Sequence, residues 1–395
     1  MLSGKTVILG VTGSIAAYKS AYLASSLVKL NADVHVIMTK NALNFISPLT
    51  FETLTCNKCL TDTFDRQFEY DVKHVSLGQK ADLMMIAPAS ADVIGKLSCG
   101  IADDMLTTTV LSATCPVIVS PAMNTHMYEK KVVQDNLKRL KDLGIKVIEP
   151  ASGYLACGDT GTGKMPEPEI LKEHILMEIA REKDLVGKKV VISAGPTRED
   201  IDPVRFISNH STGKMGYSLA HEAAMRGASV TLVTGPVAFE PPLNTSVINV
   251  NSAKDMYDAL MGEYDDADAV IMAAAVADYR PKNVSCEKIK KSTDDSAIEL
   301  TRTDDILMAM GQHKGGRVLC GFSMETENVL ENSRKKLKKK NLDMIVVNNL
   351  RTEGAGFGTD TNVVTIITCE GEYDLPKASK HEVSKKILDR ITQMM

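Results

Sequence analysis

The sequence of 395 residues contains no tryptophan, and aromatic residues make up only 5% of it. Its eight cysteines are too few for a disulfide scaffold in a chain of this length, and they fit free thiols in a reducing compartment. No run of about 18 apolar residues occurs, and the N-terminus lacks the ordered parts of a signal peptide. We therefore expect a cytoplasmic protein with no membrane partner.

Neither basic nor acidic residues dominate the sequence: 46 basic and 50 acidic residues leave a formal net charge of only −4. A balanced chain has no general attraction for polyanions, so we expect no nucleic-acid partner. Any bound anion must then be held by local geometry. Hydrophobic residues at 44% and charged residues at 24% are typical of globular proteins, and the length suits about two or three domains.

Short apolar runs alternate with amphipathic helical patterns along the whole chain. In the first half they predict strands at 6–10, 33–39, 82–87, 117–120 and 146–149, and a helix over 15–30. The pattern then restarts, with strands predicted at 189–194, 229–234, 269–274, 318–322, 344–347, 363–368 and 372–375, and helices at 214–226, 327–340 and 377–395. This alternation predicts an α/β fold of two Rossmann-like domains with mainly parallel sheets, residues 1–183 and 188–395.

The first predicted strand leads into a glycine-containing turn. Such a turn exposes backbone N–H groups at a helix N-terminus, where a phosphate binds well. The spacing is not G-x-G-x-x-G, because Thr12 stands where the second glycine is required, so the dinucleotide fingerprint fails. About half of such turns serve only as tight packing connections. A monophosphate held by the Ser14 hydroxyl and its neighbouring amides fits the turn equally well.

Polar residues also follow three other predicted strands of the first half. Thr39 ends the second strand, Ser90 follows the third, and Asn124 follows the fourth. Ligands of open α/β sheets bind at the carboxyl ends of the strands. We therefore expect Ser14, Thr39, Ser90 and Asn124 to converge on one crevice.

These motifs resemble those of the homo-oligomeric, flavin-containing cysteine decarboxylases. Residues 121–127 match P-x-M-N-x-x-M, residues 88–92 resemble the P-A-S-A motif, and His74 matches the active-site histidine. Residues 156–167 resemble the substrate clamp of phosphopantothenoylcysteine decarboxylase. The motifs follow the family's order across nearly all of the first half. The resemblance implies a flavodoxin-like domain that binds FMN, with contacts from Gly13, Ser14, Ile15, Thr39, Ser90 and Met123.

The resemblance also implies a redox route to decarboxylation. A carboxylate next to saturated carbon leaves poorly because the remaining electrons have no acceptor. In the family, FMN oxidises the terminal thiol to a thioaldehyde, CO2 leaves to give an enethiolate, and reduced FMN returns the hydride. Carried over, Cys157 supplies the last proton, His74 acts as a base or orients the thiol, and Asn124 hydrogen-bonds the substrate carboxylate.

Each of these residues also has a purely structural interpretation. A lone histidine before a strand is usually structural, a cysteine between alanine and glycine usually packs, and Met123 with Met127 can form part of a core. The joint order of the motifs favours the functional interpretation. Cys56 and Cys59 form a C-x-x-C pair, but no second pair at metal spacing accompanies them, so we interpret this pair as coincidental.

In the second half, residues 195–213 form a polar connection that is long for a strand–helix link, which favours a function. It lacks a Walker A motif, because Met215 follows Lys214 where serine or threonine is required. Residues 273–281 continue from the end of the predicted strand at 269–274 and begin with small side chains, which would let a base or ribose approach the backbone. In the same segment, Asp278 could hold a metal-bound triphosphate. Lys336 and Lys340 lie on one helix face, which alone is typical of a solvated basic surface.

Residues 190–395 resemble bacterial phosphopantothenate–cysteine ligase at 194–216, 273–281, 288–291, 321–326 and 340–343. In that family the 4′-phosphopantothenate carboxylate attacks the α-phosphate of CTP and pyrophosphate leaves. The amine of cysteine then displaces CMP from the acyl-cytidylate. Negative charge spreads over the transition state, so lysines and Mg²⁺ are expected.

The resemblance implies that Lys288 stabilises the first step and that Asn209 binds the acyl-cytidylate in the second. Asp278 is the candidate residue for binding Mg²⁺ together with CTP. The nucleotide site implied by the resemblance comprises Ala273, Ala274, Asp278, Lys288, Asp305, Ile306, Phe322, Lys336 and Lys340.

The chain is thus identified as a member of the bifunctional decarboxylase–ligases of coenzyme A biosynthesis. The C-terminal half would make 4′-phosphopantothenoylcysteine from 4′-phosphopantothenate, cysteine and CTP, and the N-terminal half would convert it to 4′-phosphopantetheine. The resemblance further implies a homo-oligomer, with trimers of the flavin domain assembled further and dimers of the ligase domain. Two alternatives stay open: an NAD(P)-dependent oxidoreductase with an appended binding domain, and a non-enzymatic flavoprotein-like regulatory scaffold.

Overall fold

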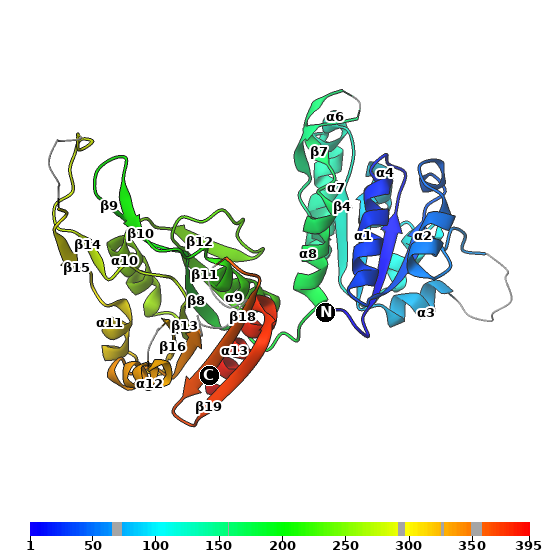
Figure 1. Cartoon of the computed structure of the whole chain (residues 1–395). Helices are drawn as coiled ribbons and strands as arrows, with labels where there is room; N and C mark the ends of the chain where they lie inside the picture. Colours follow the sequence, from blue (N-terminus) through cyan, green and yellow to red (C-terminus); the bar gives the residue numbers. More distant parts are fainter. Residues whose placement is uncertain (65–72, 157, 291–296, 325–327, 349–357) are drawn as a thin grey trace. The chain divides into compact units, whose positions relative to one another are not determined.

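The computed structural model describes residues 1–64, 73–156, 158–290, 297–324, 328–348 and 358–395. The chain divides into two units, Met1–Glu182 and Lys183–Met395 (Figure 1), and each is described by itself. The division of activities between residues 1–183 and 188–395 stays a prediction at this point.

The first unit contains a five-stranded parallel sheet in the order β2–β1–β3–β4–β5. Its strands are β1 (Thr6–Val11), β2 (Asp33–Met38), β3 (Leu83–Ala89), β4 (Val117–Pro121) and β5 (Lys146–Val147). Every residue of β1 and β3 is buried. Helices cover both faces of such a sheet, which is why these strands are continuous apolar runs in the sequence.

Helices pack on both faces of this sheet. The helices of the unit are α1 (Ala17–Lys29), η1 (Ala42–Asn44), α2 (Pro48–Thr55), α3 (Lys73–Lys80), α4 (Ala91–Cys99), α5 (Met105–Ser112), α6 (Thr125–Tyr128), α7 (Lys131–Asp142) and α8 (Pro168–Ile179). Buried side chains of α3, α4, α5 and α7 form one core with the sheet. Helices α1 and α8 pack against each other and against β3. An antiparallel hairpin, β6 (Ala151–Tyr154) with β7 (Thr160–Lys164), lies outside the main sheet.

The second unit contains an eight-stranded sheet in the order β12–β11–β8–β13–β16–β17–β18–β19. Pairing is parallel from β12 to β17 and antiparallel at β18 and β19. Its strands are β8 (Lys189–Ala194), β11 (Ser229–Thr234), β12 (Thr245–Asn249), β13 (Ala269–Met272), β16 (Val318–Met324), β17 (Met344–Asn348), β18 (Thr361–Thr368) and β19 (Glu372–Ser379). The predicted α/β class with mainly parallel sheets is confirmed.

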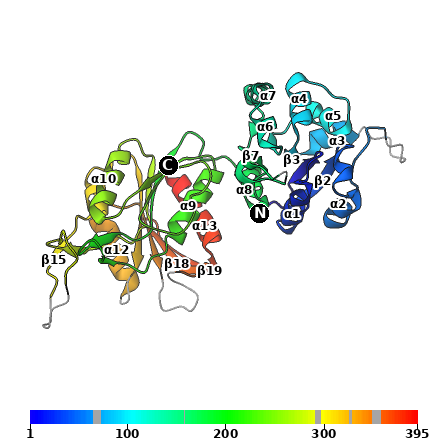
Figure 2. The ribbon, with the colours of Figure 1, turned by 90° about the horizontal axis from the view of Figure 1, so that it is seen from above.

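Two helix layers flank this second sheet (Figure 2). Its helices are α9 (Lys214–Met225), α10 (Ala253–Tyr264), α11 (Ile306–Gln312), α12 (Val329–Lys339) and α13 (Lys380–Met394). Helices α10, α11 and α12 share one core with the sheet. Helices α9 and α13 pack against each other, and both contact sheet strands. Two short antiparallel hairpins were not predicted: β9 (Arg198–Asp200) with β10 (Phe206–Ser208), and β14 (Tyr279–Pro281) with β15 (Leu300–Arg302).

The predicted strand at 269–274 is two residues too long. β13 ends at Met272, because the next residues bond to the turn after β8 instead of continuing the sheet. Ala275 N–H donates to Gly195 O at 2.9 Å, and Thr197 N–H donates to Ala275 O at 3.2 Å. Among the described residues, no helix combines the length and apolar character needed to cross a bilayer.

Replacing Tyr264 with phenylalanine tests the core of the second unit. This ring is 1% exposed, its hydroxyl donates to Met310 O at 2.8 Å, and the Arg317 guanidinium lies 4.7 Å from its centroid. We expect Tyr264→Phe to lower the free energy of unfolding by about 1 kcal/mol, because a buried hydrogen bond is lost. Urea unfolding followed by circular dichroism measures it. The half-buried Tyr257 on the same helix is the control, and an equal loss in Tyr257→Phe would contradict this account.

Candidate functional site

The first unit has a cavity of about 440 Å³. Three segments that are distant in the sequence line it: the turn and first residues of α1, the loop after β4, and the β6–β7 hairpin. Of the predicted residues, Ser14, Ile15, Met123 and Asn124 line this cavity. The carboxyl edge of the sheet therefore gathers these four residues, as expected for an open parallel sheet.

A hydroxyl group ties the turn after β1 to the turn after β3. Thr12 Oγ1 donates to Pro88 O at 2.8 Å and accepts from Ser90 N–H at 2.9 Å, and the Thr12 side chain is buried. The sequence pointed to Thr12 only as the residue that breaks the dinucleotide fingerprint. In the structure, the threonine hydroxyl bonds to two backbone groups of the neighbouring turn, and a glycine would provide neither bond.

Gly13, Thr39 and Ser90 belong to the same strand edge but do not line the cavity. Thr39 N–H donates to Val11 O at 3.0 Å, whereas its buried Oγ1 has no hydrogen-bond partner among the described residues. Ser90 caps α4 by accepting from Val93 N–H. A side chain at Gly13 would come within 2.7 Å of Asn41 Cβ, so the turn is closely packed. The predicted convergence of four polar residues on one crevice therefore holds for Ser14 and Asn124 alone.

Asn124 is held by two hydrogen bonds at the start of α6. Its Oδ1 accepts from His126 N–H at 2.8 Å, and its Nδ2 donates to Asp159 Oδ2 at 2.7 Å. The amide thus already binds a carboxylate. Asp159 was not predicted, although it belongs to the clamp motif, and Cys157 lies outside the described residues.

Besides the Asn124–Asp159 bond, other hydrogen bonds attach the β6–β7 hairpin and the segment that follows it to the rest of the unit. Met123 N–H donates to Gly163 O at 3.0 Å. The Lys19 ammonium, whose side chain is only 5% exposed, donates to Met165 O and to Glu167 Oε1, both at 2.9 Å. The hydrogen bond from Lys19 lowers the pKa of Glu167 below its usual range. Sequence reasoning missed Lys19, since a lysine within an amphipathic helix is expected at the surface.

His74 is not brought to this cavity within the chain. It lies half-buried in α3, where its carbonyl accepts from the Ser112 hydroxyl at 2.6 Å. The two cysteines of the C-x-x-C pair lie in different surroundings. Burial raises the pKa of the Cys59 thiol to about 12, opposite to the shift of reactive cysteines, and Cys56 is exposed.

Two glycines of the hairpin provide a matched test of its attachment. Gly163 and Gly153 have φ values of +148° and +155°, but a Cβ at Gly163 would lie 2.4 Å from Met123 O, whereas one at Gly153 meets nothing within 4 Å. We expect Gly163→Ala to detach the hairpin and raise amide exchange at Met123 roughly tenfold. Hydrogen–deuterium exchange measures this, and Gly153→Ala controls for backbone strain. Equal exchange in the two variants would contradict the close-contact explanation.

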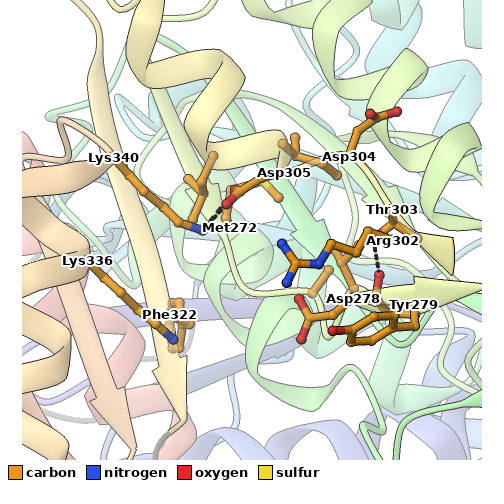
Figure 3. A pocket seen from close by; sticks show the side chains of 15 residues that line it. Met272, Asp278, Tyr279, Arg302, Thr303, Asp304, Asp305, Phe322, Lys336 and Lys340 are labelled. Atoms are coloured by element: carbon orange, nitrogen blue, oxygen red, sulfur yellow. Dashed lines mark hydrogen bonds and ion pairs between the residues drawn. The ribbon is translucent and has the colours of Figure 1, made fainter.

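The second unit has a cavity of about 490 Å³ lined by residues after β13, the start of α11 and one face of α12. Figure 3 shows Lys336 and Lys340 on one side, with Asp278 and Arg302 on the other. Lys340 forms an ion pair with Asp305 at 2.8 Å, and Asp305 also caps α11 by accepting from Met308 N–H. The predicted residues Ala274, Asp278, Asp305, Ile306, Phe322, Lys336 and Lys340 all line this cavity.

A neighbouring cavity of about 320 Å³ shares four lining residues with the first. It contains the predicted Asn209 and Ala273, and also Lys214 at the start of α9 and Lys380 at the start of α13. Burial, with Lys214 nearby, lowers the pKa of the Lys380 ammonium. Ser323 Oγ is buried there without a partner among the described residues. Lys214 pairs with Asp360 at 2.8 Å and the Lys380 ammonium donates to Thr359 O, so an anion in this part of the cleft would meet two cations and the unpaired Ser323 hydroxyl and would compete with Asp360 for Lys214.

The turns after β8 and β13 are bonded together beneath this cleft. Ser193 Oγ accepts from Ala274 N–H at 3.1 Å, and Thr197 Oγ1 accepts from Ala277 N–H at 3.0 Å. Asn209 Nδ2 donates to Ala275 O at 2.9 Å. The small residues after β13 are therefore fixed in place, and Asn209 is oriented over them. Sequence reasoning did not single out Ser193 and Thr197, because their bonding partners, Ala274 and Ala277, lie about 80 positions later in the chain.

Lys288 is exposed and lines none of these cavities. The motif residues 291, 325 and 326 lie outside the described residues. In the described part of the chain, no group of three or more His, Cys, Asp or Glu side chains could hold a metal ion. A divalent cation at Asp278 would therefore need ligands from a bound anion.

Comparisons with known proteins match both units. The family described as DNA/pantothenate metabolism flavoprotein C-terminal domain matches residues 185–395, and the family described as Flavoprotein matches residues 1–180. The Coenzyme A biosynthesis bifunctional protein CoaBC of Bacillus subtilis (strain 168) is 49% identical over 398 residues, covering 100% of this chain and 98% of that protein. The protein of the same name from Vibrio parahaemolyticus is 44% identical, covering 100% and 99%. A crystal structure of the C-terminal domain of CoaBC is 45% identical, covers 54% of this chain and 98% of that chain, and has a TM-score of 0.47.

Proposed function

This chain belongs to the family of bifunctional coenzyme A biosynthesis proteins, and on that premise we propose a role for each of its two units. It is a bifunctional enzyme with a ligase and a flavin-dependent decarboxylase activity. The observation that carries the proposal is that each matched family covers one structural unit, and each unit has its own polar cavity. We assign the decarboxylase to the first unit and the ligase to the second.

The first unit fits FMN on its own geometry. Helix α1 begins without a side-chain cap on its N-cap residue, and the Ser14 hydroxyl accepts from Ala16 N–H at 3.3 Å, so this hydroxyl and the neighbouring amides lie together where a phosphate would bind. The buried Thr39 Oγ1 in the same strand edge lacks a partner among the described residues. We propose that Gly13, Ser14, Ile15, Thr39, Ser90 and Met123 hold FMN. When bound, FMN supplies a two-electron acceptor that makes loss of CO2 from a saturated carbon feasible.

The protein groups around that site bind substrate and move protons. The Asn124 amide already donates to a carboxylate, that of Asp159, so it is suited to hold the substrate carboxylate in the charged form. We propose Cys157 as the acid that gives the last proton. His74, as base or as the group that orients the thiol, lies outside the cavity of its own chain, so its role depends on a homo-oligomer. We propose trimers of the first unit assembled further, and dimers of the second unit.

In the second unit, we propose that CTP occupies the joined cavities. Its base and ribose would lie against Ala273, Ala274 and Phe322, and its phosphates near the cationic part of the cleft. Lys336 and Lys340 come from one helix face, as the four-residue spacing requires. Asp305 and Ile306 complete the nucleotide site, and Asp278 would bind Mg²⁺ together with the triphosphate. Asn209 would hold the acyl-cytidylate, and Lys288 would stabilise its formation.

The two alternative functions are less well supported. An oxidoreductase of the dinucleotide type requires a glycine where Thr12 makes two buried hydrogen bonds. A regulatory scaffold has no need of the ordered Asn124 amide or the cationic cleft. We also propose a cytoplasmic location, on the composition of the chain, and the small-molecule substrates 4′-phosphopantothenate, cysteine and CTP, on its resemblance to the ligase family.

Reconstitution of both reactions tests the proposed function. The purified protein should show a flavin absorbance band and, with 4′-phosphopantothenate, cysteine, CTP and Mg²⁺, should yield CMP, pyrophosphate and 4′-phosphopantetheine by mass spectrometry. Accumulation of 4′-phosphopantothenoylcysteine would overturn the assignment of the first unit. Absence of both CMP and flavin would overturn both assignments.

Two variants separate the units in the same assay. Cys157→Ser should keep flavin and ligase activity but release an oxidised, decarboxylated product, because the final proton is missing. Lys288→Gln should abolish pyrophosphate release while supplied 4′-phosphopantothenoylcysteine is still decarboxylated. A normal yield of 4′-phosphopantetheine from Cys157→Ser would show that another group is the acid.

Binding of CTP should depend on pH through Lys380. Because burial lowers the pKa of this ammonium, its charge is lost at a lower pH than that of exposed lysines, and its attraction for phosphate falls as pH rises through that pKa. We expect the KM for CTP to rise with pH, at a lower pH than the titration of an exposed lysine would give. In the Lys380→Met variant, the KM for CTP should be about tenfold higher than in the wild type at neutral pH, and it should depend less on pH. Initial rates of pyrophosphate release measure it, with exposed Lys385→Met as the control; identical profiles for Lys380→Met and wild type would refute the role.

A further inference from the structure

The turn between β9 and β10 contains a buried carboxylate that neither unit's chemistry has so far used. Asp202 is 2% exposed and lies in the long polar connection before α9. Its Oδ1 accepts from the N–H groups of Val204 and Arg205, both at 2.9 Å, and its Oδ2 accepts from Arg205 Nε at 3.0 Å. A second guanidinium nitrogen of Arg205 also donates to Oδ2. The bond from Arg205 holds the pKa of this carboxyl well below its usual range, so it stays charged.

The same carboxylate reaches a distant loop, the one that carries Lys288. Ile289 N–H donates to Asp202 Oδ2 at 3.1 Å, and Arg205 Nη2 donates to Ile289 O at 2.9 Å. Both backbone groups of Ile289 are thus bonded to one Asp–Arg pair. At the other end of the loop, Ser285 N–H donates to Ile201 O at 3.0 Å.

Burial cannot hold this loop, because residues 286–290 are all exposed. An exposed segment with few apolar contacts is ordered by whatever polar bonds it makes. Lys288 has a long side chain with several rotatable bonds, so fixing it for the reaction costs conformational entropy. A mobile backbone would increase that entropy cost. The hydrogen bonds to Ile289 restrict the backbone beside Lys288 and so reduce this cost.

We propose that Asp202 is a positioning residue for the first half-reaction of the ligase, in which it fixes the backbone beside Lys288; this rests on the ligase function proposed above. Asp202 acts through Ile289 and Arg205, and it does not touch substrate. Asp202 restricts the backbone beside Lys288 in the same manner whether Lys288 acts at the cavity of its own chain or at that of a second copy.

The second half-reaction should be insensitive to this contact. Asn209 is held by separate bonds: its amide donates to Ala275 O, and Ser208 Oγ in the adjoining β10 donates to Thr197 O at 2.8 Å. Loss of the Asp202 carboxylate leaves these bonds in place. Arg205 is half exposed, so water can hydrate its charge when the partner is removed. The two half-reactions therefore distinguish positioning of Lys288 from general damage to the unit.

The test uses the full-length protein and Asp202→Asn. Pyrophosphate release from CTP and 4′-phosphopantothenate, without cysteine, should fall by about 10²-fold, the loss typical of a misplaced catalytic group. CMP release from supplied 4′-phosphopantothenoyl-cytidylate and cysteine should be little changed. In a Lys288→Gln background, Asp202→Asn should cause little further loss, because its effect passes through Lys288.

Asp200→Asn, at an exposed carboxylate in the same hairpin, is the matched control and should behave as wild type. Wild-type pyrophosphate release in Asp202→Asn, equal losses in both half-reactions, or an additive double variant would each overturn the inference. If the wild-type protein itself releases no pyrophosphate, the proposed ligase function fails and this inference with it. Failure of the ligase function is distinguishable from failure of this inference alone, because it is seen in the wild-type protein and not only in Asp202→Asn.

Discussion

Hydrogen bonds between the turns that follow neighbouring parallel strands hold both candidate sites together. In the first unit, the Thr12 hydroxyl joins the turns after β1 and β3. In the second, Ser193 and Thr197 do the same for the turns after β8 and β13. A parallel sheet places its carboxyl ends at one edge but does not fix the loops that leave them. The hydroxyl groups of Thr12, Ser193 and Thr197 supply that constraint by bonding to backbone groups of the neighbouring turn.

These hydrogen bonds explain how loops outside the sheets come to hold the polar side chains of the candidate sites in place. Gly195, Thr197 and Ala275 are bonded through their backbones, so the small residues after β13 form a fixed floor for the cleft. Asn209 is then oriented by a carbonyl of that floor. In the first unit, Met123 N–H and the buried Lys19 ammonium attach the hairpin to the cavity. In both units an ordered amide faces a cavity because its loop is held by neighbours from other strands.

Much of the fold could be predicted from the sequence, because buried parallel strands are continuous apolar runs. The strands at 189–194 and 229–234 lie where the pattern predicts them. The hairpins β9–β10 and β14–β15 could not be predicted, since three-residue strands such as Arg198–Asp200 are too short and polar to show alternation. β13 was predicted too long because apolar small residues continue past Met272, where bonding to another turn replaces bonding in the sheet.

For the sites, the sequence identified residues by motif, and the structure shows what holds them. Of the nine residues expected for the nucleotide site, seven line one cavity, Ala273 lines the neighbouring cavity, and Lys288 lines neither. Thr12, Lys19 and Asp202 could not be found in this way, because their role is to satisfy backbone groups far away in the sequence. Lys288 shows the difference most clearly. It was chosen from a short basic motif, but an exposed lysine has no fixed place of its own. The hydrogen bonds that Asp202 and Arg205 make to Ile289 hold the backbone beside it. The role proposed for Lys288 therefore rests on a carboxylate 86 positions earlier in the chain, because that carboxylate limits the freedom of the loop before any substrate arrives.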